Sequence, residues 1–333
     1  MIGVRPLVPG LAVVALIAAL AWTLGSLVPL VGAPVLALVA AVIIRNAAQV
    51  PATLRPGVDF TLKRLLRAAI ILFGATLSLV QVLQIGAGSF AVIFVTILMA
   101  LGLTWLFGRW LHAPSGLTNL IGVGTAICGA TAIITVGPII ESKEEEIAFA
   151  VTTIFLFNML AVVVYPLLGH LFTLSDAAYG VWAGTAIHDT SSVLAASFQF
   201  SEPAGKVATV VKLTRTLMLV PLALAYGIAH SYQQTRLGAG RGVRVNIVKI
   251  FPWFILWFVV ASVLNTAGLF QAPVVRWSSL IARFLVVMVM AAVGLSADLK
   301  RMREIGLRPF YIGLAASVMI AVVSIVLIRS FIG

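Results

Sequence analysis

Residues 184–197 read GTAIHDTSSVLAAS and place two ionisable side chains, His188 and Asp189, inside an otherwise apolar stretch. In a predicted helix over 178–198, His188 lies about ten residues from the start, or ~15 Å along the axis, near the middle of a bilayer. An ionisable group at that depth is costly and generally marks a functional site. We therefore expect His188 and Asp189 to take up a proton or a cation during a working cycle, with Thr190 and Ser191 at a binding edge. A structural alternative is a neutral His188 and an Asp189 that caps a half-helix beginning at Thr190.

The composition around this stretch indicates a membrane protein. The chain is 62% hydrophobic and 10% charged, and its mean hydropathy is +1.15, whereas soluble domains carry roughly 25% charged residues. The net charge of +12 comes from short clusters of Lys and Arg between apolar runs. Such clusters are typical of membrane topology signals, and they argue against a nucleic-acid-binding surface.

Eleven apolar segments are long enough to be predicted as transmembrane helices in one all-α, polytopic domain spanning residues 1–333. They are 9–30, 33–50, 65–83, 89–110, 117–140, 147–172, 178–198, 205–230, 248–268, 276–297 and 308–331. With a cytoplasmic N-terminus, the inner connections hold fifteen Lys and Arg residues and the outer ones four, which is the expected bias. This orientation places the acidic run 141–146 outside and the long polar link 231–247 inside, where it would join two bundles.

The segment 117–140 contains the run NLIGVGTAICGATAIITVGP, in which glycines, threonines and a terminal proline are concentrated. Freed backbone groups at this depth survive when they line a cavity, so we expect a broken helix that offers hydrogen bonds from Thr125, Cys128, Thr131 and the local backbone. Close packing of helices through small residues is the alternative. The tetrapeptide GTAI occurs at 124–127 and again at 184–187. This echo is either a coincidence or a sign that one of the two segments is re-entrant.

Two cations, Lys212 and Arg215, lie three residues apart on one face of the predicted helix 205–230. Each costs roughly 3 kcal/mol at the centre of a membrane helix, so the pair requires partners. We expect Arg215 and Lys212 to bind an anionic substrate, Arg215 as a planar fork and Lys212 as a more mobile charge. An ion pair that fixes helix packing is the alternative.

Four segments together resemble the YeiH-type sulfate exporters, a family of bacterial inner-membrane proteins. They are 124–158, with KEEE; 180–197, with IHD; 210–224, with KLTR; and 290–306, with GLSADLK. The resemblance implies two inverted five-helix repeats, 33–172 and 178–331, after an extra N-terminal helix within 1–30. It also implies broken helices that cross at the midplane of the membrane, at 117–140 and 276–297, and a homodimer. The family has Glu at the position of Asp189, so the carboxylate arm is one methylene shorter here.

The sequence thus predicts a secondary active transporter that exports sulfate or a related sulfur oxyanion, coupled to protons, from the bacterial inner membrane. An alternative is a sodium- or proton-coupled carrier of an organic acid, with Asp189 as the cation site. A membrane enzyme or sensor that uses His188 is a third possibility, of a different class. The chain shows no phosphate-cradling loop, zinc spacing or helical HExxH motif, so we expect neither enzymatic activity nor a metal or other cofactor.

Overall fold

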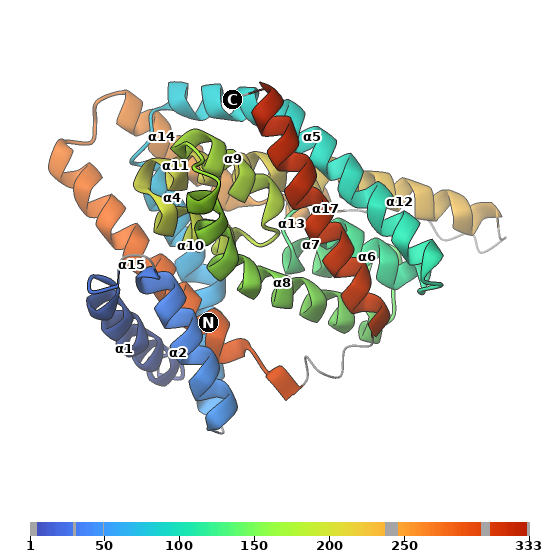
Figure 1. Ribbon diagram of the computed structural model, residues 1–333, viewed down its shortest axis with the longest axis horizontal. Helices are drawn as coiled ribbons and strands as arrows, with labels where there is room; N and C mark the ends of the chain where they lie inside the picture. Colours follow the sequence, from blue (N-terminus) through green and yellow to red (C-terminus); the bar gives the residue numbers. More distant parts are fainter. Residues whose placement is uncertain (1–4, 29–30, 49, 237–245, 301–306, 332–333) are drawn as a thin grey trace.

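The computed structural model describes residues 5–28, 31–48, 50–236, 246–300 and 307–331, and this part of the chain is helical without a strand (Figure 1). Six of its helices are long and apolar enough to cross a membrane, and two shorter apolar helices accompany them. The all-α, multi-pass architecture is therefore confirmed. The central part of the predicted link 231–247, residues 237–245, lies outside the described residues.

Each of the eleven predicted segments contains helix. In chain order the elements are α1 (Val8–Gly25), α2 (Gly32–Ala47), η1 (Ala52–Leu54), α3 (Arg55–Phe60), η2 (Thr61–Leu65), α4 (Leu66–Gly74), α5 (Leu79–Trp110), α6 (Ser115–Ala126), α7 (Ala130–Val136), α8 (Glu144–Leu171), α9 (Asp176–Ala186), α10 (Thr190–Phe200), α11 (Glu202–Leu217), α12 (Leu219–Arg236), α13 (Ile247–Ile250), α14 (Trp253–Thr266), α15 (Ala272–Ser296) and α17 (Leu307–Phe331).

One predicted boundary was wrong. Residues 79–83 belong to α5 and not to the preceding helix, because Ser78 begins α5 with a capping box formed with Gln81.

The predicted segment 117–140 is a re-entrant hairpin of α6 and α7, called hairpin 1 here. Its tip is Ile127–Gly129, where Gly129 has a φ of +66° that strongly favours glycine. Gly116 near its start and Gly137 at its end both lie against the first turn of α8, at Glu146 and Ile147. The hairpin therefore begins and ends at the same end of the molecule. The predicted break is confirmed, but the prediction of a crossing helix was wrong.

The predicted segment 178–198 is a second re-entrant hairpin, α9 and α10, called hairpin 2, with its tip at residues 187–189. The ring of Tyr179 near its start stacks on Phe200 at its end with 3.9 Å between centroids. The Ser201 hydroxyl donates to Asp176 Oδ1 across the same base at 2.5 Å. Because α11 then runs back along α9 and α10, this segment also does not cross the molecule.

The two hairpins enter from opposite ends of α8. Hairpin 1 has its base at the first turn of α8, whereas Gly169 near the last turn of α8 packs against Tyr179 and Phe200 of hairpin 2. Their tips meet in the middle, where Gly129 approaches Asp189. The repeated GTAI therefore ends the first helix of both hairpins, at Ala126 and Ala186.

Two further predictions require correction. The expected crossing helix 276–297 is unbroken, since α15 continues to Ser296 and its Gly294 serves close packing against α2. The acidic run 141–146 and the link beginning at 231 were placed on opposite sides. Glu141 instead lies 3.5 Å from His230 and accepts a hydrogen bond from Gln234 of α12, so both lie at the end where α8 begins.

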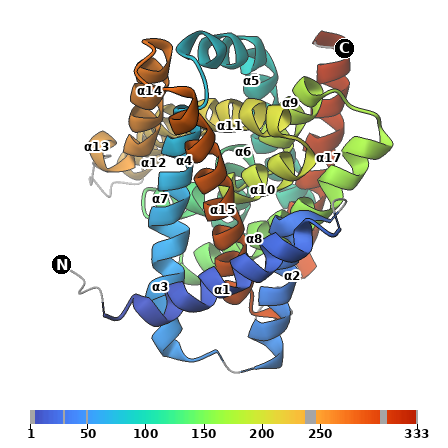
Figure 2. The same ribbon diagram turned by 90° about the vertical axis from the view of Figure 1, so that its left-hand side faces the viewer.

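The helices pack as two groups. One contains α1, α2, α4, α14 and α15, and the other contains α5, both hairpins, α8, α11 and α17. Figure 2 shows α1, α2 and α15 together, with α17 on the far side of the hairpins. Hairpin 2 is the main contact between the groups, through α10 against α2 and α15 and through Phe198 stacked on Phe73 at 4.2 Å.

Candidate functional site

The two cations of α11 lie at the meeting point of the hairpin tips. Lys212 and Arg215 are both fully buried. Lys212 Nζ donates to Ile127 O of hairpin 1 at 2.9 Å and to Ile187 O of hairpin 2 at 3.0 Å. A single ammonium group thus joins the two tips.

Arg215 lies one turn further along α11 and also joins the two hairpins. Its Nε donates to Ala126 O at 2.5 Å and its Nη2 to Thr125 O at 2.8 Å, both in hairpin 1. Its Nη1 donates to Thr185 O in hairpin 2. The carbonyls at a helix C-terminus lack intrahelical partners and carry partial negative charge. The pair therefore caps the C-terminal ends of α6 and α9.

This arrangement answers the question of partners for the cations. Among the ion pairs of the described residues, none contains Lys212 or Arg215, so the alternative of a fixed ion pair was wrong. The expected partners were an anionic substrate or an ion pair, and the carbonyls at the helix ends were not predicted. The duplicated GTAI was the available signal, because it marks the two helix ends that the cations bind.

Asp189 caps α10, as the structural alternative predicted. Its Oδ2 accepts from Ser191 N at 2.9 Å and Ser192 N at 3.3 Å, and it also accepts the Ser191 hydroxyl. Asp189 is partly exposed, whereas Thr190 and Ser191 are buried. The carboxylate thus stabilises the restart of the helix beside the cation pair.

The tip of hairpin 2 is anchored by residues that the sequence had not assigned to the site. Asn158 lies at the centre of α8, and its Oδ1 accepts from His188 N at 3.1 Å and Asp189 N at 3.0 Å. His188 Nε2 lies 2.8 Å from Ser317 Oγ of α17. An Asn within an apolar helix was the only signal for the first contact, and Ser317 gave none.

Two buried polar atoms at the tips have no hydrogen-bond partner, Thr125 Oγ1 and His188 Nδ1. Buried polar atoms are almost always paired, so such atoms commonly indicate a bound water or ligand. Cys128 is buried at the bend of hairpin 1. Thr131 is exposed on α7 and is not part of the buried cluster.

The side-chain charges at the tips do not cancel. Each helix C-terminus contributes about −0.5 charge and each N-terminus about +0.5, so the four hairpin ends sum to roughly zero. Lys212 and Arg215 add two positive charges and Asp189 removes one. Every other carboxylate of the described residues lies outside the tips. With all three side chains ionised, their formal charges sum to +1.

Comparisons with known proteins extend over nearly the whole chain. Residues 9–328 match the family described as "Conserved hypothetical protein 698". A UPF0324 membrane protein of Clostridium tetani is 36% identical over 326 residues, covering 95% of this chain and 94% of that protein. UPF0324 membrane protein SAG1125 of Streptococcus agalactiae is also 36% identical, over 96% of both chains.

These relatives are named as membrane proteins, and their names state neither a substrate nor an activity. Sulfate export therefore stays a prediction. The length of the match and the identity establish the relationship itself. The chain belongs to the family described as conserved hypothetical protein 698, with the UPF0324 membrane proteins as relatives.

Proposed function

We propose that the protein is a secondary active transporter that exports a small anion, such as sulfate or a related sulfur oxyanion, and binds it between the hairpin tips. One observation carries the proposal: two fully buried cations share this enclosed region with a single carboxylate. An uncompensated charge is costly inside a membrane protein. A mobile anion would balance it during part of the cycle.

The hydrogen-bonding capacity of the cations supports this role. An Arg guanidinium has five N–H donors and a Lys ammonium has three. Three donors of Arg215 and two of Lys212 are directed at carbonyls, which leaves about three donors for an oxyanion. The unpartnered hydroxyl of Thr125 adds a fourth.

The hairpins supply a route for alternating access. Because they enter from opposite ends of α8, opening hairpin 1 would expose the tips to one side of the membrane, and opening hairpin 2 would expose them to the other. His188 and Asp189 lie at the tip of hairpin 2, where proton uptake would accompany its movement. The transported anion and the coupled proton would thus share one region.

A transport assay tests the proposal. Proteoliposomes containing the protein should accumulate labelled sulfate or sulfite under an imposed pH gradient. Lys212→Met should abolish this flux, because it removes the excess charge. Lys249→Met is the matched control, because Lys249 is an exposed lysine of α13 that lies in neither hairpin. Absence of flux in the wild type for every anion tested, or equal flux in both variants, would contradict the proposal.

A membrane hydrolase is a second candidate, favoured by the 2.8 Å contact between His188 Nε2 and Ser317 Oγ. A Ser–His pair can form an activated nucleophile. The pair lies at the end of an apolar groove of about 440 Å³ between α8, α9 and α17. Labelling of Ser317 by a fluorophosphonate, lost in His188→Gln, would support a hydrolase, and an unlabelled protein with sulfate flux would favour the transporter. A carboxylate substrate is also an anion, so the positive charge at the tips favours an organic acid as well, but it disfavours a sodium site at Asp189.

A further inference from the structure

Three basic side chains line one cavity at the end of the molecule where hairpin 2 has its base. Lys206 of α11 and Arg276 and Arg283 of α15 line one cavity of about 1090 Å³. The two arginines are seven residues apart, so they share a face of α15. We call this the terminal cavity.

One carboxylate neutralises only part of this charge. Glu202 lies 3.1 Å from Lys206 and 3.6 Å from Arg283. No other acidic side chain lines the terminal cavity, so the three cations and Glu202 leave an excess of two positive charges. Like charges on one wall repel each other. Their convergence is favourable when an anion lies among them.

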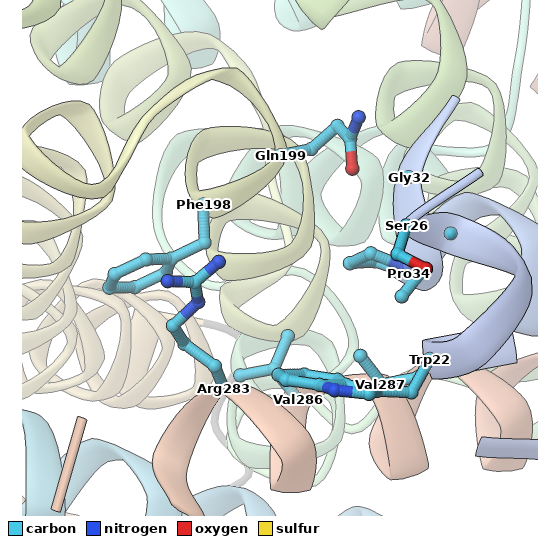
Figure 3. A pocket seen from close by; sticks show the side chains of 11 residues that line it. Trp22, Ser26, Gly32, Pro34, Phe198, Gln199, Arg283, Val286 and Val287 are labelled. Atoms are coloured by element: carbon cyan, nitrogen blue, oxygen red, sulfur yellow. The ribbon is translucent and has the colours of Figure 1, made fainter. Parts of the chain in front are cut away.

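Arg283 also lines a second, smaller cavity of about 330 Å³. Figure 3 shows Arg283 rising from α15 toward Phe198 of α10, with Trp22 and Pro34 to the right and Gln199 above. Arg283 therefore lines both cavities. It can donate to a ligand in the terminal cavity while its pairing with Glu202 fixes its direction.

The walls of the terminal cavity combine these charges with exposed apolar side chains. Trp277 is 62% exposed and Leu280 is 43% exposed, and both line it. Tryptophan is typical of the level at which lipid headgroups meet the hydrocarbon region. Phosphate and sulfate oxygens are the groups that arginine binds best at such a level.

We propose that the terminal cavity is a binding site for a phosphate- or sulfate-type oxyanion held by Arg276, Arg283 and Lys206. Two sources supply this chemistry: the headgroup of an anionic phospholipid, and a free inorganic anion. The lipid source is independent of the proposed transport function. The free anion would be on its way from the hairpin tips, and that reading rests on the proposed function.

Thermal-shift titration of the purified protein tests the site, with inorganic phosphate in a neutral detergent and with phosphatidylglycerol against phosphatidylcholine. We expect Arg276→Gln with Arg283→Gln to weaken stabilisation by one of the two probes about tenfold, since two charge-assisted contacts are lost. Arg329→Gln, an exposed arginine near the end of α17, is the matched control and should respond like the wild type.

The outcome separates this site from the hairpin tips. Loss of the phosphate response in the double variant assigns a free anion to the terminal cavity, and loss of the phosphatidylglycerol response assigns a lipid headgroup. Responses to both probes that equal those of the wild type overturn the site. A phosphate response lost only in Lys212→Met would leave the proposed function intact while excluding the terminal cavity as a phosphate site. Normal sulfate flux together with a lost phosphatidylglycerol response in the double variant would support a lipid site in the terminal cavity that is separate from the transport site.

Discussion

At the scale of single residues, Lys212 and Arg215 hold the tips of two hairpins together through backbone carbonyls. Their depth and need for partners could be predicted from sequence, since both lie too far inside an apolar helix to reach the membrane surface. The partners could not, because a backbone carbonyl leaves no mark in the sequence. Which carbonyls are free depends on where helices end, and the first helix of each hairpin ends beside Lys212 and Arg215.

Arg215→Lys should keep the charge and lose the planar fork that reaches three carbonyls in two hairpins. We expect the protein to fold with a stability loss of about 1–3 kcal/mol, because at least one buried carbonyl is left unpaired. Sulfate affinity should fall roughly tenfold if the fork also holds the anion. Thermal unfolding with and without sulfate measures both effects. An unchanged sulfate response would assign Arg215 to capping alone.

Asn158→Ala should destabilise the tip of hairpin 2, because the amides of His188 and Asp189 both donate to this side chain. Leaving two buried amides unpaired costs about 1–3 kcal/mol each, reduced if water enters. Asn265→Ala, in the partly exposed last turn of α14, is the matched control. Equal melting temperatures for the two variants would show that Asn158 does not anchor the tip.

At the scale of elements, the breaks in both hairpins could be predicted, but the direction after each break could not. Glycine and threonine at 122–131 indicate that a helix is interrupted, and Asp189 with Thr190 is typical of a helix start. Whether the chain continues or turns back is decided by packing against α8 and α11, which the local pattern does not contain. The GTAI echo did suggest re-entry of one segment, and both are re-entrant.

The two re-entrant hairpins change the predicted side of only two connections, 137–143 and 172–175. Hairpin 1 returns to the side from which it enters, so the connections after it switch sides. Hairpin 2 does the same, so the connections after it return to their predicted sides. We therefore expect the acidic run 141–146 on the side that holds most of the basic residues. Lys143 then lies on that side, which holds sixteen Lys and Arg residues, and the opposite side holds three. This distribution fits the positive-inside bias better than the predicted fifteen against four.

Cysteine labelling from one side of the membrane tests this arrangement. In vesicles of one orientation, a membrane-impermeant maleimide should label Glu145→Cys and Thr235→Cys together, and Thr173→Cys only from the other side. The native Cys128 is 3% exposed and should stay silent. Labelling of positions 145 and 235 from opposite sides would restore two crossing helices in place of the hairpins.

At the scale of the whole molecule, the helices form two groups that meet chiefly through hairpin 2. The sequence predicted an all-helical membrane protein from composition alone, because apolar runs of about 20 residues have few other structures available. It did not predict the grouping, which depends on contacts between helices distant in the chain. The inverted five-helix repeats and the homodimer stay predictions.

Fixing hairpin 2 to α2 should stop transport while leaving the fold intact, because hairpin 2 could then no longer open. Ala33 of α2 and Gln199 of α10 line the same cavity between the groups, so Ala33→Cys with Gln199→Cys can be joined by a short bifunctional maleimide. We expect sulfate flux to fall at least tenfold after joining, with each single variant unaffected by the reagent. Full flux through the joined protein would show that hairpin 2 does not open during transport.

The central claim is that an oxyanion binds between the hairpin tips, beside Lys212 and Arg215. A structure determined with selenate, a sulfate analogue that scatters anomalously, tests it most directly. The account predicts an anomalous peak within hydrogen-bond distance of Lys212 Nζ or the Arg215 guanidinium. Selenate found only elsewhere, with Lys212 and Arg215 bound to the same carbonyls as before, would contradict it.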